Sequence, residues 1–119
     1  MKRACAVLAI VSVLALGGFG SSSAVAATGG PITTQRVRIL VFAFYPNVFK
    51  VSSGATVTVK NLDWSLFQEP HTFTALDGSF DSGPILATPV KVVAPDAPGN
   101  YQFHCLIHPF MNGLLVVTG

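Results

Sequence analysis

Short runs of β-branched and aromatic residues, separated by turn-forming residues, recur from residue 36 to the last residues of the chain. The segment "ATVTVKN" alternates apolar and polar residues, and "GNYQFHC" and "GLLVVTG" are also rich in strand-forming residues. Such runs predict short strands, and no segment has a helical period with caps. About seven strands in about 90 residues indicate one all-β domain, a Greek-key β-sandwich of about seven to eight strands.

The first residues have a different composition and are predicted to be a signal peptide. Lys2 and Arg3 precede an apolar run, and a small-x-small pattern typical of a signal-peptidase site ends at Ala26. The alternative is a retained membrane anchor, but the run is shorter than the roughly 20 residues that a spanning helix needs. Cleavage near Ala26 implies a periplasmic or extracellular protein. The predicted organisation is a signal peptide over residues 1–26, a linker over residues 27–35 and a domain over residues 36–119.

The predicted mature chain has no net charge. The whole sequence has 7 lysines and arginines against 5 aspartates and glutamates, and Lys2 and Arg3 account for the difference. We expect no basic run or patch that would indicate binding to nucleic acid or anionic lipid. We therefore expect no nucleic-acid partner, no membrane contact beyond the export signal, and a monomer.

Cys105 is the one cysteine of the predicted mature chain, because Cys5 lies in the signal peptide. A lone thiol in an exported protein cannot form an internal disulfide. It can form an intermolecular bridge, remain buried and inert, act as a nucleophile or bind a metal ion. The choice depends on the residues around it.

The segment "CLIHPFM" places Cys105, His108 and Met111 at intervals of three. A tight loop between two adjacent strands can aim these side chains at one point on the rim of the sandwich. His71, at the head of the predicted strand "HTFTAL", supplies a fourth donor. Because strand side chains alternate between faces, His104 points away from Cys105, and we predict that it is not a ligand.

Two imidazoles, one thiolate and one thioether match a specific metal preference. Trigonal coordination by two histidines and a cysteine, with a weak axial methionine, is typical of a blue-copper electron-transfer site. A structural zinc site would favour more cysteines and would not need the methionine. We therefore predict one copper ion per chain, and its predicted ligands are His71, Cys105, His108 and Met111.

These motifs and their order resemble the cupredoxins, the small blue-copper proteins that include plastocyanin, pseudoazurin and amicyanin. The resemblance covers about residues 36 to 118 and includes "EPHTFTALDGSFDSG" and "APGNYQFHCLIHPFMNGLLVV". The spacing Cys-x2-His-x2-Met, with Pro109 after the histidine, is similar to the short amicyanin-type loop. The resemblance implies an eight-stranded Greek-key sandwich, copper near one end, and one-electron transfer between larger redox proteins.

The chain departs from the family pattern at two places. Thr72 follows the first ligand histidine, where Asn is common, and its hydroxyl can still tie the two ligand loops together. The segment "LDWSLFQEP" is longer than in typical relatives. Its apolar residues either cover the core or extend the surface near the copper. The residues predicted to fill the core are Phe42, Phe44, Phe49, Phe73, Phe80, Tyr101 and Phe103.

An exported electron carrier without enzymatic activity is the function that the ligand set and the resemblance imply. A protein that binds or delivers copper outside the cytoplasm would use the same ligands, but a rigid site anchored on strands argues against ready release. A thiol enzyme with Cys105 as nucleophile leaves Met111 unexplained. We expect a redox donor and a redox acceptor to dock on an apolar face near His108 and Phe110. Further residues that can contribute to this face are Pro109, Pro84, Ile85 and Trp64.

Overall fold

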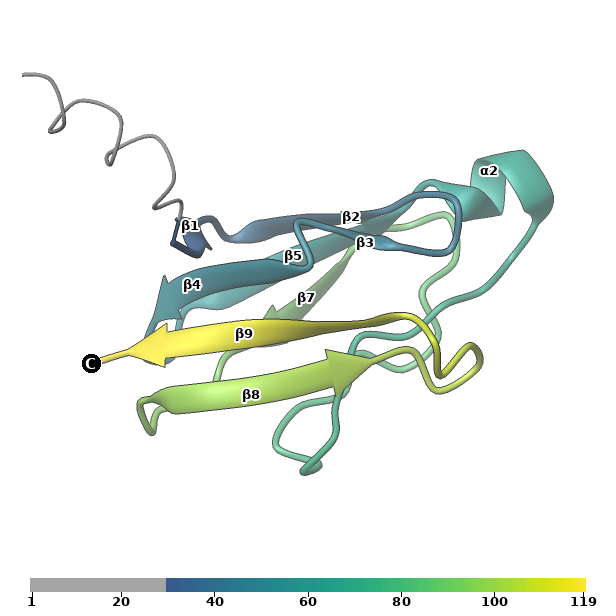
Figure 1. The fold of residues 1–119 in the computed structure, drawn as a ribbon. Helices are drawn as coiled ribbons and strands as arrows, with labels where there is room; N and C mark the ends of the chain where they lie inside the picture. The colour runs from purple at the N-terminus through teal and green to yellow at the C-terminus, as the bar shows by residue number, and fades with distance from the viewer. Residues whose placement is uncertain (1–29) are drawn as a thin grey trace, which may run out of the picture.

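Two β-sheets face each other across one hydrophobic core (Figure 1). The computed structural model describes residues 30–119, so the predicted signal peptide and the first part of the predicted linker lie outside the described residues. The five-stranded sheet has the order β1-β4-β9-β8-β6, and the four-stranded sheet has the order β3-β2-β5-β7. The predicted all-β sandwich is confirmed.

The chain crosses between the two sheets several times. The five-stranded sheet contains β1 (Ile32–Thr33), β4 (Val48–Ser52), β6 (Thr74–Ala75), β8 (Gly99–His104) and β9 (Asn112–Thr118). The four-stranded sheet contains β2 (Arg36–Ile39), β3 (Phe44–Tyr45), β5 (Thr56–Asn61) and β7 (Val90–Val93). Both sheets are mixed, since β4 runs parallel to β1 and β9, and β2 runs parallel to β5. The strand β1 lies in the predicted linker, so that segment also contributes to the sandwich.

The core consists largely of aromatic rings. Five of the residues predicted to fill it are buried, namely Phe44, Phe49, Phe73, Phe80 and Phe103. The ring centroid of Phe103 lies 4.6 Å from that of Phe73 and 5.0 Å from that of Phe44, which is the spacing of favourable aromatic pairs. Tyr101 and Phe42 are only partly buried and pack against this cluster, so the prediction for these two was wrong.

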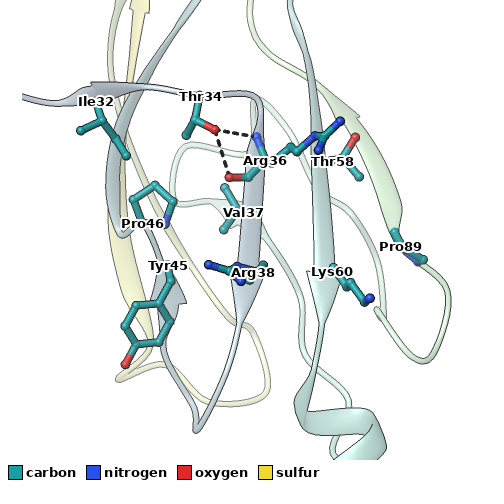
Figure 2. A pocket seen from close by; sticks show the side chains of 10 residues that line it. All are labelled: Ile32, Thr34, Arg36, Val37, Arg38, Tyr45, Pro46, Thr58, Lys60 and Pro89. Carbon is teal, nitrogen blue, oxygen red and sulfur yellow. Dashed lines mark hydrogen bonds between the residues drawn. The ribbon is translucent and has the colours of Figure 1, made fainter.

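The outer face of the four-stranded sheet carries a cluster of basic residues. Strand β2 buries Val37 and Ile39 and exposes the arginines between them, as expected for period-two alternation. An open groove of about 730 Å³ crosses this face and is lined in part by basic side chains (Figure 2). The expectation of no basic patch was therefore wrong. The charges sit on alternate positions of separate strands, and only the pairing of those strands brings them together. The exposed basic residues of this face are Arg36, Arg38, Lys60 and Lys91.

Strand β2 ends at Ile39, and the chain turns soon after it. Val41 and Phe42 have φ angles of 49° and 56°, in the left-handed region that bulky residues seldom adopt. Their backbone N–H groups donate to the carboxylate of Asp63, at 2.6 and 2.8 Å. These hydrogen bonds hold a tight turn that leads into β3, which pairs antiparallel with β2.

Within the described residues there is one short helix, α2 (Asp63–Phe67), whereas no helix was predicted. It occupies most of the segment "LDWSLFQEP". Leu66 and Phe67 are 59% and 51% exposed and extend the surface, whereas Leu62 and Trp64 are half-buried. No helix in residues 30–119 is long and apolar enough to cross a membrane.

Candidate metal centre

Two loops meet at one end of the sandwich, beyond the end of β8 (Figure 1). Cys105 follows β8 directly, and the chain turns back through His108 and Met111 into β9. The Met111 N–H donates to the carbonyl of His108 at 2.9 Å, and the Cys105 N–H donates to the carbonyl of Met111 at 3.0 Å. His71 lies on the other loop, where its backbone pairs with that of Ile85. Both loops are therefore fixed by backbone hydrogen bonds.

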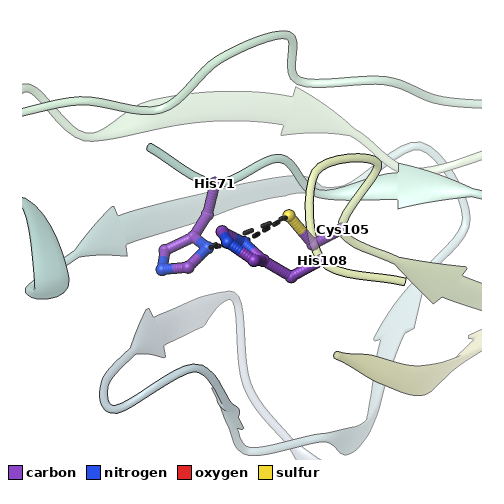
Figure 3. A group of neighbouring side chains, drawn as sticks. All are labelled: His71, Cys105 and His108. Atoms are coloured by element: carbon purple, nitrogen blue, oxygen red, sulfur yellow. Dashed lines mark hydrogen bonds between the residues drawn. The ribbon is translucent and has the colours of Figure 1, made fainter. Parts of the chain in front are cut away.

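Three donor atoms converge where these loops meet (Figure 3). The Nδ1 atoms of His71 and His108 lie 3.2 Å apart, and the sulfur of Cys105 lies 3.8 Å from each of them. His71 and Cys105 are 0% exposed, and the side chain of His108 is 17% exposed. Of these three predicted ligands, only His108 reaches solvent.

The triangle formed by the three atoms has the size of a metal site. A point equidistant from all three lies about 2.1 Å from each, and metal–nitrogen and metal–sulfur bonds in zinc proteins measure about 2.0–2.3 Å. Two imidazole nitrogens and a thiolate are also the strong donors of a blue-copper site. The residues present therefore fit a copper ion.

Met111 and His104 lie near the three donor atoms but differ in their relation to them. Met111 is buried in the same loop, at 2% exposed, and its role as a weak fourth ligand stays a prediction. His104 lies outside the donor group. It is half-buried and pairs with Thr74 across β8 and β6, which agrees with the prediction that it is not a ligand.

Thr72 connects the two loops, as its position after His71 predicted. Its backbone N–H donates to the sulfur of Cys105 at 3.3 Å. Its side-chain Oγ1 accepts a hydrogen bond from the N–H of Leu106 at 2.8 Å. A hydrogen bond to a thiolate sulfur partly neutralises its charge, and the second bond keeps the loops in register.

Aromatic rings cover the histidines on the solvent side. Phe42 meets both rings edge-on, with centroids 5.4 Å from His71 and 5.0 Å from His108. Phe110 lies 5.9 Å from His108 and is 69% exposed. Ile85, which was predicted to contribute to this surface, is 0% exposed and belongs to the core.

A carboxylate that the sequence analysis missed lies behind His71. Asp63 is completely buried, and its Oδ2 lies 2.9 Å from Nε2 of His71. Burial alone would raise the pKa of Asp63, but hydrogen bonds from the N–H groups of Phe42 and Val41 and from the His71 ring hold that pKa below its ordinary value. The side chain is therefore a buried anion at neutral pH.

A second carboxylate lies behind the other histidine. Glu69 Oε1 lies 3.1 Å from Nε2 of His108, and the two side chains are 33% and 17% exposed. Solvent screens this pair far more than the buried one. Each histidine thus turns Nδ1 toward Cys105 and Nε2 toward an acidic side chain.

Asn61 holds the segment that carries both carboxylates. Its side-chain amide donates to the carbonyls of Glu69 and Ile85, each at 2.8 Å. Its side-chain oxygen accepts from the N–H groups of Asp63 and Trp64, at 3.0 and 3.3 Å. The one signal in the sequence was two acidic residues within the eight positions before His71. The sequence did not show that these residues face the two histidines predicted as ligands.

This chain is similar in sequence and fold to small copper proteins. Residues 8–117 match a family model described as a cupredoxin-like domain. A structure of a reduced amicyanin variant is 23% identical, with a TM-score of 0.60, and the alignment covers 78% of this chain and 89% of that one. An amicyanin variant in the reduced Cu(I) form at pH 4 is 25% identical, with a TM-score of 0.58 and coverages of 80% and 89%.

A larger protein contains a similar unit. A Cu-containing nitrite reductase from Thermus scotoductus SA-01 is 22% identical, with a TM-score of 0.58, and the alignment covers 76% of this chain but only 23% of the reductase. A search of curated protein sequences found no match.

Proposed function

This chain belongs to the cupredoxin-like family, and from that premise we propose that it is an exported blue copper protein that carries single electrons between redox partners. The observation that supports this most directly is the convergence of the Nδ1 atoms of His71 and His108 on the sulfur of Cys105. Met111, buried in the same loop, is the proposed fourth and weaker ligand.

The ligand set suits copper in both of its common oxidation states. Thiolate and thioether favour Cu(I), and imidazole binds Cu(I) and Cu(II) alike. When bound, copper supplies a centre that is oxidised and reduced by one electron. The hydrogen bonds of Thr72 and of the 105–111 turn hold the ligands in one arrangement, so the protein itself changes little when the charge changes.

The site is built for electron transfer better than for catalysis or release. His71 and Cys105 are completely buried, and a catalytic metal site keeps one position open for substrate. Release of copper to a receiving protein would require the 105–111 turn to open. Copper binding and delivery outside the cytoplasm remains the second candidate function, because it uses the same donor set.

Titration with copper tests the proposal. The protein should bind one equivalent of Cu(II) and develop an intense visible absorption from sulfur-to-copper charge transfer, and a mild reductant should bleach it reversibly. A colourless copper complex would exclude the electron-carrier function. Rapid transfer of Cu(I) to a competing chelator, without reversible bleaching and recolouring, would favour the delivery function.

We further propose that the protein works in the periplasm or outside the cell. The positive start, the apolar run and the pattern ending at Ala26 support export. Mass spectrometry of the protein expressed with its full sequence should find a mature chain that begins near Ala27. A chain that keeps its first residues and stays with the membrane would support the anchor instead.

We propose that redox partners dock over His108. Exposed apolar side chains surround this histidine, the ligand that reaches solvent. Phe110 contacts its ring, and Phe67 stacks on Phe42 beside it at 6.2 Å. Leu106 and Ile107 of the same loop are 54% and 45% exposed. Phe110 is the most exposed of these side chains, at 69%, and large aromatic side chains often contribute most to binding.

Electron self-exchange between oxidised and reduced copies tests this surface without a known partner. Phe110→Ala should slow self-exchange about tenfold, which corresponds to about 1.4 kcal/mol of lost contact free energy. Val93→Ala is the matched control, because Val93 is 62% exposed but lies on β7, in the other sheet. NMR line widths of mixed-valence samples measure the rate. Equal rates for both variants would place the docking surface elsewhere.

A further inference from the structure

Asp63 has a feature that packing does not explain. Among residues 30–119 it is the one carboxylate that is completely buried. Burying a charge is costly unless hydrogen bonds and opposite charges compensate for it. Here the carboxylate accepts from the N–H groups of Val41 and Phe42 and lies against the ring of His71. An apolar side chain would fill the same volume, but it would leave the two N–H groups and the His71 ring without this acceptor.

We propose that Asp63 is a positioning residue for the metal centre, which holds His71 in the metal-binding tautomer and favours the oxidised state through its negative charge. This inference rests on the proposed function, because it concerns the same site. It adds Asp63 as the hydrogen-bond partner of His71, and it states that this carboxylate lowers the midpoint potential.

The tautomer follows from the donors and acceptors present. A neutral imidazole carries a hydrogen on one nitrogen only, and a carboxylate can only accept. With Asp63 Oδ2 at 2.9 Å from Nε2, the hydrogen of His71 resides on Nε2. The lone pair of Nδ1 then points at Cys105 and His108, where a metal ion would lie.

The direction of the potential follows from charge. Oxidation adds one positive charge to the centre, and an anion bonded to a ligand stabilises the more positive state. Asp63 acts from within the protein, where screening is weak. Glu69 has the same relation to His108 but is partly exposed, so its influence is smaller.

The same carboxylate also places a covering ring. By accepting from the N–H groups of Val41 and Phe42, it holds both residues at positive φ. That turn sets the Phe42 ring edge-on to His71 and His108. Asp63 thus links helix α2, the turn before β3 and a ligand histidine through one side chain.

The first test uses the metal-free wild-type protein. Nitrogen-15 NMR of its histidines should show His71 as a single tautomer with the hydrogen on Nε2 and slow exchange of that hydrogen with water. A hydrogen on Nδ1, or a rapidly exchanging mixture, would overturn the proposal. This measurement does not depend on copper or on any variant folding.

The second test compares Asp63→Asn with Glu69→Gln, since each change removes a charge at nearly constant size. We expect Asp63→Asn to lower the ratio of Cu(II) to Cu(I) affinity about tenfold, which raises the midpoint potential by about 59 mV for one electron. Glu69→Gln should raise the midpoint potential by a smaller amount. An unchanged potential in folded, copper-loaded Asp63→Asn, or an equal rise in both variants, would overturn the proposal.

The outcomes separate this inference from the proposed function. A wild-type protein that forms no blue copper complex would refute the function, while the tautomer of His71 would still decide the role of Asp63 in positioning the ring. A blue wild-type protein whose midpoint potential is unchanged by Asp63→Asn would refute the inference but not the proposed function. If Asp63→Asn does not fold, the wild-type NMR measurement decides.

Discussion

Replacing Cys105 with serine is expected to abolish the intense visible absorption of the copper-loaded protein. The absorption arises from charge transfer between a thiolate sulfur and Cu(II), and a serine hydroxyl neither ionises at neutral pH nor supplies that transition. The variant should fold, since the side chains are similar in size and the Thr72 N–H can donate to oxygen as well as sulfur. Visible and circular dichroism spectra measure colour and fold separately.

His104→Gln is the matched control for this variant. His104 adjoins Cys105 in the chain but lies outside the donor group. Its substitution should leave the absorption unchanged, whereas His71→Gln should remove or shift it. Loss of colour in the His104 variant would mean that the strand faces are displaced by one residue.

Gly113→Ala is expected to lower the free energy of unfolding by about 3 kcal/mol, at the upper end of the usual cost of overpacking. A methyl group there would come closer than 3.0 Å to the carbonyl oxygen of Asn47 and to two ring atoms of Phe103. Neither neighbour can move freely, because that carbonyl accepts from the N–H of Leu114 at 2.7 Å and Phe103 is 0% exposed. Denaturant unfolding of the metal-free protein measures the loss.

Gly30→Ala provides the control for this effect. A methyl group on Gly30 meets no atom within 4 Å, so stability should change little. An equal loss in both variants would show that general chain flexibility, and not the close approach of β9 to Asn47 and Phe103, determines the cost.

The strands were predictable because their signal is local. Alternation in "ATVTVKN" and in "GNYQFHC" reports directly which residues face the core, and β5 and β8 occupy those positions. The ligand-type residues of the Cys105 loop were equally easy to predict, since three of them lie within seven positions of the sequence. His71 was found because it completes a donor set of known chemistry.

The carboxylates and helix α2 were not predictable in the same way. Asp63 contacts Val41 and Phe42, which lie more than 20 positions earlier in the chain. That contact depends on how a turn at unusual φ angles and a five-residue helix pack together, and neither has a pattern that repeats in the sequence. Phe42 was assigned to the core for the same reason, since its hydrophobicity is visible in the sequence but the direction of its turn is not.

The position of β9 sets the order in which the protein can mature. This strand lies between β8 and β4, and its residues pair with Val48–Ser52, about sixty-six positions earlier in the chain. A ribosome adds residues from the N-terminus at about 5–20 per second, so most of the sandwich is synthesised before this partner exists. The loop from Cys105 to Met111 joins β8 to β9, so it is closed only after this last strand has been made. Until then Cys105, His108 and Met111 are not held together, so the donor group of the candidate metal centre forms late in folding.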